Sequence, residues 1–307
     1  MQRSAVLFGT MVALALAAPA SAQTVAPGGP VEAPFTSTPF PDTMETARGM
    51  AMGLGARASA TSTSGLAYNA AGLSIGRLYH VETAIGYEPG SGRLQFGGSV
   101  IDSYSGPVNA GVNFRYVHGN GHGGHGGYDG RIALGIPIGE AFALGVTGRY
   151  VSFWREGQEG APPWTEGISL DASIRVTPVP GLHLAALGYN LIPLPSPLTP
   201  MQVGGSASYT IDNRVTIAFD GLADLSSWTN EDGSIRPEAL LAGGLEYFTG
   251  EVPIRAGYVY DTGRNAHYLT AGVGWVNQQV GIEIAWRQQL THEYHAWLLA
   301  TFRYFVH

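Results

Sequence analysis

The sequence predicts a transmembrane antiparallel β-barrel of about fourteen strands, with an N-terminal plug segment. Residues 168–176 alternate between apolar and polar side chains, and residues 280–287 show much the same two-residue period. A strand with this period has one apolar and one polar face. Many such segments run about ten residues, the length that crosses a bilayer when tilted. Only 13% of the residues are charged, whereas about 25% is usual and a soluble sandwich carries more charge outside.

The N-terminus predicts an exported protein. Residues 1–22 have the features of a secretory signal peptide: Arg3, an apolar core over residues 5–18, and an A-x-A cleavage site that ends before Gln23. A membrane-anchoring helix is disfavoured because the apolar core is too short. The chain has no Cys, which argues against a lipoprotein. We therefore expect the hydrogen-bond ladder of a closed barrel to supply stability in place of disulfides.

Two segments of different composition precede the predicted strands. Residues 23–44 are Pro-rich and polar, which favours an extended periplasmic linker over a recognition segment for a partner. Residues 45–76 are rich in Gly, Ala and Ser, so a helix there would be marginal in water. Because this second segment comes directly before the first strand, we expect it to fold back into the lumen and plug it.

Residues 77–307 predict the barrel itself. An even number of strands returns the C-terminus to the side where the barrel began, as single-chain bacterial barrels require. Connections after even-numbered strands are short, and the long ones follow odd-numbered strands, which predicts periplasmic turns and outer loops respectively. The predicted strands are centred on residues 78–88, 92–102, 108–117, 128–137, 141–153, 166–177, 181–190, 201–210, 214–223, 237–248, 252–261, 267–276, 279–289 and 294–306.

The last predicted strand has an apolar face that ends at the C-terminus. Such a face is typical of clients of the outer-membrane assembly machinery, although His307 stands where an aromatic residue is usual. Aromatic residues near the strand ends indicate interfacial girdles, but ordinary β-propensity explains them equally well. The apolar face consists of Leu298, Ala300, Phe302, Tyr304 and Val306.

Residues 48–74 resemble the N-terminal segment of the FadL-type outer-membrane transporters and of the related PorV-like barrels. Those chains begin with a Gly/Ala-rich helical stretch and a motif close to N-P-A-G-[LM]. Ala70 stands where the family has Pro, and residues 61–64 are Thr and Ser where the family usually has acidic residues. The residues that match the plug motif are Asn69, Ala71, Gly72 and Leu73.

This resemblance implies a fourteen-stranded barrel with an N-terminal plug. The FadL-type branch implies uptake of hydrophobic molecules, in which a ligand binds an outer apolar groove, the plug shifts, and a gap in the wall releases the ligand sideways. The PorV-like branch implies assistance to protein export. The sequence leaves both branches open.

The alternation also predicts that charges of both signs face the lumen. They form either a polar path or head-group site for a substrate, or a set of ion pairs that fills the lumen and holds the plug. Buried charges need partners, so we favour the ion pairs. The principal residues are Glu82, Arg115, Arg149, Asp171, Arg175, Glu283 and Arg287, joined by Gln95, Asn113, Arg131, Asp220, Glu246, Arg255 and Arg303.

Two predicted outer loops have unusual compositions. His118, His122 and His125 lie in a Gly-rich loop and are potential Zn²⁺ or Cu²⁺ ligands. Ordering such a loop costs about 1–2 kcal/mol per residue, so we favour a mobile loop and predict no metal site. The second loop is apolar and Pro-rich, and it either lines the entrance for a hydrophobic ligand or folds over the barrel mouth. Its apolar residues are Leu191, Ile192, Leu194 and Leu198.

No motif for catalysis or cofactor binding is present. The chain lacks G-x-S-x-G, H-E-x-x-H, phosphate-loop and dinucleotide patterns, and no Ser stands in an identifiable motif with His80 or His183. We therefore expect neither an enzyme nor a cofactor. The net charge of −7 forms no basic stripe, which argues against a nucleic-acid partner.

We therefore expect a barrel in the bacterial outer membrane that passes small hydrophobic molecules, fatty-acid-like or aromatic, across that membrane. The alternative is a non-transporting barrel that anchors or assists the export of another protein. The expected partners are outer-membrane lipids and lipopolysaccharide, the outer-membrane assembly machinery, and a small hydrophobic ligand.

Overall fold

The computed structural model describes most of the chain after residue 44. The described residues are 45–54, 56–90, 92–118, 125–155, 165–194, 196, 198–228, 230, 232–291 and 295–306. The predicted signal peptide (1–22) and Pro-rich linker (23–44) lie outside the described residues. No helix among the described residues is long and apolar enough to cross a membrane.

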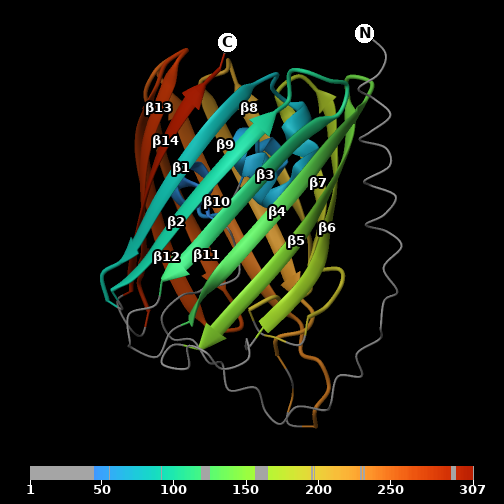
Figure 1. The fold of residues 1–307 in the computed structure, drawn as a ribbon, viewed down its shortest axis with the longest axis vertical. Coiled ribbons are helices and arrows are strands. Elements are labelled where there is room, and N and C mark those ends of the chain that lie inside the picture. Colours follow the sequence, from blue (N-terminus) through green and yellow to red (C-terminus); the bar gives the residue numbers. More distant parts are fainter. Residues whose placement is uncertain are drawn as a thin grey trace.

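Fourteen antiparallel strands close into one barrel, in which each strand pairs with its sequence neighbours and β14 pairs with β1 (Figure 1). The predicted strands are confirmed, with ends that differ by three residues or fewer. The strands are β1 (Tyr79–Glu88), β2 (Arg93–Asp102), β3 (Asn109–His118), β4 (His125–Ile138), β5 (Phe142–Arg155), β6 (Thr165–Val179), β7 (Leu182–Tyr189), β8 (Gln202–Ile211), β9 (Val215–Asp224), β10 (Glu238–Phe248), β11 (Pro253–Asp261), β12 (Ala266–Val276), β13 (Val280–Gln289) and β14 (Ala296–Phe305).

The two ends of the barrel differ in their connections. We call the end where β1 begins and β14 ends the terminal end, and the opposite end the loop end. The longest connections, which are β5–β6, β7–β8 and β9–β10, all lie at the loop end. One strand start was predicted incorrectly: β4 begins at His125, inside the expected loop, because it pairs with a long β5 as far as Arg155.

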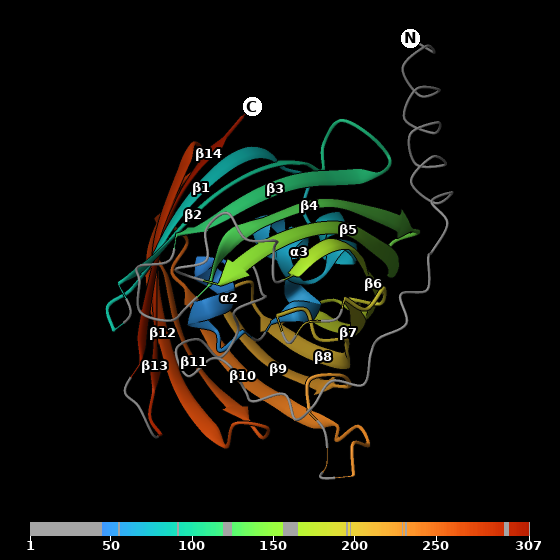
Figure 2. The same ribbon diagram turned by 60° about the horizontal axis from the view of Figure 1, so that its bottom comes forward.

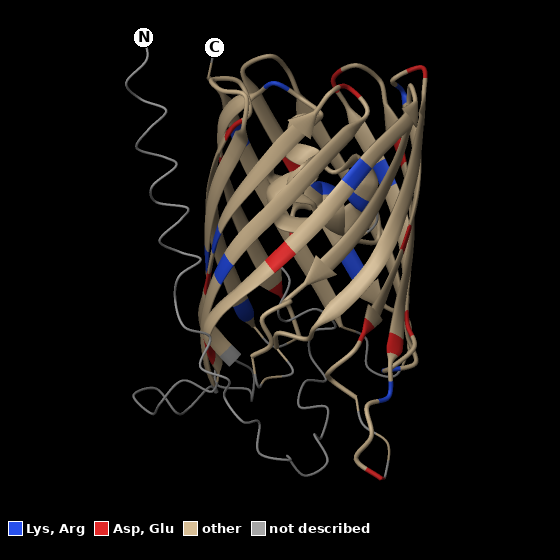
Figure 3. Cartoon of the chain, turned by 90° about the vertical axis from the view of Figure 1, so that its right-hand side faces the viewer, with Lys and Arg blue, Asp and Glu red and all other residues tan. Residues whose placement is uncertain are grey.

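Burial follows the alternation along each strand, with apolar residues outside and polar residues inside. Ile132, Ile168 and Phe219 point outward and are 63%, 66% and 65% exposed, whereas the inward Arg115 and Glu82 are each 2% exposed. Long stretches of the wall carry no charged residue at all (Figure 3). A surface that is apolar outside and polar inside is the reverse of a soluble sandwich, and it identifies a transmembrane barrel.

The described residues between 45 and 76 run inside the barrel (Figure 2), and we call them the luminal segment. Its short helices contact most of the wall: α2 (Ala47–Ala51) contacts β11 to β14, η1 (Arg57–Ser59) contacts β7 to β9, α3 (Ser62–Tyr68) contacts β2 to β4, and η2 (Ala70–Ser74) contacts β3 to β6. These helices have at most seven residues, so wall contacts must hold them in place.

Glycine allows the luminal segment and the wall to approach at backbone distance. A Cβ atom added to Gly145 of β5 would collide with the backbone nitrogen of Ala71, and one added to Gly257 of β11 would collide with the backbone of Met52 and Gly53. These positions therefore require Gly for close approach.

Candidate functional site

A chain of alternating charges lines the lumen near the terminal end. Arg303 lies 2.5 Å from Glu82 and 3.5 Å from Glu283. Arg255 lies 2.7 Å from Glu283 and 2.5 Å from Glu246. These five residues come from β1, β14, β13, β11 and β10, and we call them the charge ladder. Because each internal member has a neighbour of opposite sign on both sides, the desolvated charges compensate one another.

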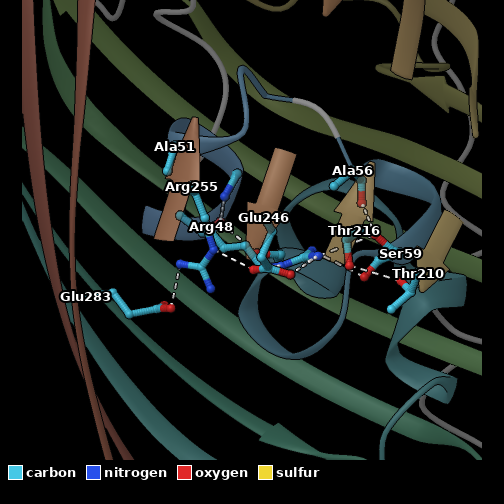
Figure 4. Close-up of polar contacts among 12 residues, drawn as sticks. Arg48, Ala51, Ala56, Ser59, Thr210, Thr216, Glu246, Arg255 and Glu283 are labelled. Atoms are coloured by element: carbon cyan, nitrogen blue, oxygen red, sulfur yellow. Dashed lines mark hydrogen bonds and ion pairs between the residues drawn. The ribbon is translucent and has the colours of Figure 1, made fainter. Parts of the chain in front are cut away.

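The charge ladder continues into the luminal segment. Arg48 of α2 lies 3.1 Å from Glu246, and Figure 4 shows Arg48 and Arg255 on this carboxylate, with Glu283 contacting Arg255 from the other side. Arg48 also donates to the backbone oxygen of Ser59 at 3.3 Å. Glu246 of the wall thus pairs both with Arg255 of the wall and with Arg48 of the luminal segment.

Two further ion pairs join the luminal segment to the wall. Arg287 of β13 donates to the Glu45 carboxylate, close to the loop end of that strand. Arg57, which is 1% exposed, lies 3.9 Å from Asp220 of β9, and its backbone nitrogen donates to the same carboxylate at 3.3 Å. Its side chain also donates to the Tyr189 hydroxyl at 3.2 Å.

Arg48 and Arg57 did not emerge from the sequence as site residues. The signal was present, because Glu45, Arg48 and Arg57 are the only charged residues in the segment 45–76. A charge in a small, apolar segment that is destined for a lumen needs a partner in the wall. In the structure all three charges have such a partner.

Three arginines converge on one carboxylate in the half of the lumen nearer the loop end. Asp129 is fully buried, and its carboxylate lies 3.1, 3.0 and 2.9 Å from Arg115, Arg131 and Arg149. We call these four residues the arginine cluster. Arg149 also donates to the Asn190 side chain at 3.0 Å. Asp129 was not predicted as a luminal residue, although it lies two positions before Arg131 in the expected strand and therefore on the same face.

The seven principal polar residues predicted for the lumen are all buried and inward-facing. They do not form one group: Glu82 and Glu283 belong to the charge ladder, Arg115 and Arg149 to the arginine cluster, and the other three contact separate partners. Asp171 accepts a hydrogen bond from the Asn190 backbone nitrogen at 2.8 Å. Arg175 donates to Ser74 at 3.2 Å, and Arg287 binds Glu45.

The four residues of the expected plug motif are buried between the rest of the segment and the wall from β3 to β6. Asn69 donates from its side chain to the Arg57 backbone oxygen at 2.8 Å, and Ala71 donates from its backbone to Ser173 at 3.2 Å. A Cβ atom at Gly72 would collide with the Ala60 carbonyl, and Leu73 is 1% exposed. The motif thus folds the segment back against its own earlier turn.

The apolar outer loop is exposed at its first residues and buried at its last. Leu191 and Ile192 are 37% and 48% exposed, and Leu194 is partly buried. Leu198 is fully buried against Val117, Val151 and Phe153.

The chain turns inward at Asn190, which has a φ of +52° and whose side chain donates to the Pro200 backbone oxygen at 2.8 Å. This turn carries the second half of the loop over the mouth.

The loop also closes an irregular part of the wall, which we call the β6–β7 seam. The β6–β7 pairing ends towards the loop end at the pair Ala172–Gly188, although β6 itself continues to Thr165. Towards the loop end, the loop takes over the contact with β6: the Leu191 backbone nitrogen donates to Leu170 at 2.8 Å, and Ser169 donates to the Ile192 backbone oxygen at 2.8 Å.

Two histidines noted in the sequence face the interior. His80 is fully buried, and its Nε2 lies 2.9 Å from the Ser62 hydroxyl, a partner that no sequence motif revealed. Both residues are buried inside the barrel, so this pair links α3 to β1. His183 contacts Thr177 at 3.0 Å. In the Gly-rich loop, His122 lies outside the described residues, and no metal-binding group occurs among the residues that are described.

Comparison with known proteins shows which solved structures have a similar fold. No family model matches the chain, and no curated protein matches it. Among solved structures, a FadL homologue of Pseudomonas aeruginosa superposes with a TM-score of 0.63 at 12% identity, covering 88% of this chain and 99% of the homologue.

Two hydrocarbon channels also superpose on the barrel. The CymD monoaromatic hydrocarbon channel gives a TM-score of 0.57 at 12% identity, with 88% and 98% of the two chains covered. The toluene transporter TbuX of Ralstonia pickettii gives 0.53 at 12% identity, with 81% and 95% covered.

The class of protein is therefore a fourteen-stranded transmembrane barrel with an internal N-terminal segment. Within that class, the chain has the fold of the FadL-type barrels.

Proposed function

We propose that this protein passes small hydrophobic molecules, fatty-acid-like or aromatic, across the bacterial outer membrane. In this proposal the terminal end faces the periplasm, because the longest connections lie at the loop end, and the luminal segment is the plug. The observation that carries the proposal is the β6–β7 seam, where an apolar loop replaces strand pairing in the wall. The fold shared with hydrocarbon channels supports it.

The proposed path starts at the exposed side chains of Leu191 and Ile192, which offer an apolar surface at the loop end. It continues inward to the apolar cluster around Leu198. From there the β6–β7 seam lies beside Leu187, which is 5% exposed and belongs to the core cluster. Movement of the loop would open the seam and release a ligand sideways into the bilayer, while the charge ladder keeps the rest of the lumen closed.

A disulfide lock tests this path directly, because the natural chain has no Cys. The Thr165 hydroxyl of β6 donates to the Ser196 hydroxyl of the loop, so the double variant T165C/S196C places two thiols across the contact. A matched control joins β8 to β9 through T210C/T216C, where the two hydroxyl oxygens lie 3.0 Å apart, at the terminal end (Figure 4).

Uptake of a long-chain fatty acid and of an aromatic hydrocarbon is measured in cells before and after oxidation. We expect the oxidised T165C/S196C variant to lose uptake and a reductant to restore it, whereas the control pair changes nothing. Unchanged uptake in the oxidised loop variant refutes the seam as the path. Wild-type uptake equal to that of a strain lacking the protein refutes transport itself.

The small size of two cavities inside the described part of the barrel favours a second candidate function, a non-transporting barrel that anchors or assists the export of another protein. Two cavities beside the luminal segment have volumes of about 10 Å³ each, which leaves room for no more than about one water molecule. If uptake is absent, capture of a secreted protein by the outer loops, with a loop-deleted variant as control, becomes the test of this second function.

A further inference from the structure

A groove of about 710 Å³ crosses the outer surface of the wall over β9 to β12. Phe219 and Tyr258 form its two sides and are 65% and 44% exposed. Gly243 lies between them, because it pairs with Phe219 across β9–β10 and with Tyr258 across β10–β11. Leu241 and Leu245 extend the sides along β10. The groove is therefore an apolar depression in the surface that faces lipid.

Inner packing does not explain the glycine that forms the floor of this groove. A Cβ atom on Gly243 would make only ordinary contacts, the nearest at 3.6 Å from the Phe219 ring, and its φ is not positive. Gly244 and Gly257 differ, since a Cβ atom on either would collide with the luminal segment at Met52. A larger side chain would thus fit at position 243, and its main effect would be to fill the groove.

A polar group stands at the end of the groove nearer the loop end. The Tyr258 hydroxyl hydrogen-bonds Nδ1 of His267, and the Tyr260 ring stacks on the His267 ring with centroids 4.6 Å apart. In the tautomer in which Nδ1 accepts from Tyr258, Nε2 carries the ring hydrogen and is a donor. His267 is one pair from the end of the β11–β12 ladder, so the orientation proposed above puts it near the lipid head groups.

We propose that the groove binds one acyl chain of a lipid A molecule, whose carbonyl oxygen accepts a hydrogen bond from Nε2 of His267. The groove lies on the surface of the barrel that faces hydrocarbon, so the group available to fill it is an acyl chain. Its volume lies within the range of about 300–1,000 Å³ that is usual for small-ligand sites. A second copy would present a convex wall, which fits poorly between the projecting Phe219 and Tyr258. The assignment to lipid A rests on the orientation proposed above and is independent of transport.

Native mass spectrometry of delipidated protein in detergent tests the proposal, with purified lipid A as the probe. We expect the wild type to retain one lipid A and Gly243→Leu to bind it at least tenfold more weakly. Gly148→Leu is the matched control, because Gly148 faces outward on β5 and a Cβ atom there has no neighbour within 4 Å; it should bind as the wild type does. His267→Ala should weaken binding by about three- to tenfold, the worth of one hydrogen bond.

Heat-modifiable migration on a gel establishes that each variant is folded before binding is measured. Equal binding of lipid A by the wild type and Gly243→Leu overturns the proposal. The proposal is also overturned if the wild type forms a dimer and the only effect of Gly243→Leu is to abolish that dimer, since the groove would then be an interface between two copies of the chain. Selective retention of a diacyl phosphatidylethanolamine instead of lipid A overturns the lipid A assignment, whereas failed uptake with intact lipid A binding counts against transport alone.

Discussion

The substitution Arg57→Ala tests whether ion pairs hold the luminal segment in place. Arg57 is 1% exposed and contacts Asp220 and Tyr189, so its removal leaves a buried carboxylate without its cationic partner. Breaking a buried ion pair in this way costs about 3–5 kcal/mol. Each 1.4 kcal/mol is a factor of ten in an equilibrium, so the population with a displaced segment should rise by about two to four orders of magnitude.

Single-channel recording in a planar bilayer is the assay, and the frequency of open events is the readout. Arg236→Ala is the control, because Arg236 is 46% exposed in its pair with Glu238 and such surface pairs contribute about 0–1 kcal/mol. The double variant R57M/D220L removes both charges and should stay closed, since an apolar pair of similar volume can replace a buried ion pair. A folded Arg57→Ala protein with wild-type open frequency would refute the reasoning.

Four further variants test the site and the inside/outside assignment. Gly72→Val should displace the segment and alter uptake while heat-modifiable migration stays normal, because the collision involves Ala60 and no strand residue; failure of the barrel to assemble would contradict this. Leu170→Arg faces lipid and should cost about 2–4 kcal/mol, whereas Asp171→Asn still accepts from Asn190 and should assemble normally in the same migration assay; the reverse result would invert the assignment. Asp129→Asn leaves three buried arginines without their shared carboxylate and should lower the unfolding temperature on the gel, and an unchanged temperature would count against the arginine cluster as a stabilising unit.

The alternation of side chains predicts the wall well because it is a local property. A residue such as Asp171 is assigned to the lumen by its two neighbours alone, whatever the rest of the chain does. The expected loop at residues 118–127 shows the limit of local reasoning. It contains glycines at most positions, and only the pairing of β4 with the long β5 extends the strand back to His125.

Partners in the lumen cannot be predicted in this way, because they are distant in sequence. The Arg57 backbone contacts a residue 163 positions away, and Arg287 binds one 242 positions away. The sequence shows that charges in the lumen need partners, but it does not show which residue pairs with which. Leu198 illustrates a different cause, since its burial depends on the left-handed turn at Asn190, which no apolar pattern encodes.

The attachments of the luminal segment differ in strength along its length. Its first part is held by ion pairs, in which Glu45 binds Arg287 and Arg48 binds Glu246. The part nearest the β6–β7 seam is held by hydrogen bonds in which at least one partner is neutral: Tyr189 donates to the Tyr68 backbone oxygen at 2.5 Å, the Ala71 backbone donates to Ser173 at 3.2 Å, and Arg175 donates to Ser74 at 3.2 Å.

A neutral hydrogen bond contributes about 0.5–1.5 kcal/mol and one with a charged partner about 1.5–3 kcal/mol, both less than the roughly 3–5 kcal/mol lost when a buried ion pair is broken. The contacts beside the seam should therefore separate first, while Glu45 and Arg48 stay anchored to β13 and β10. A plug that is released on one side and anchored on the other opens a path along the wall and keeps the centre of the lumen closed to water. That asymmetry is what sideways release of a hydrophobic molecule requires.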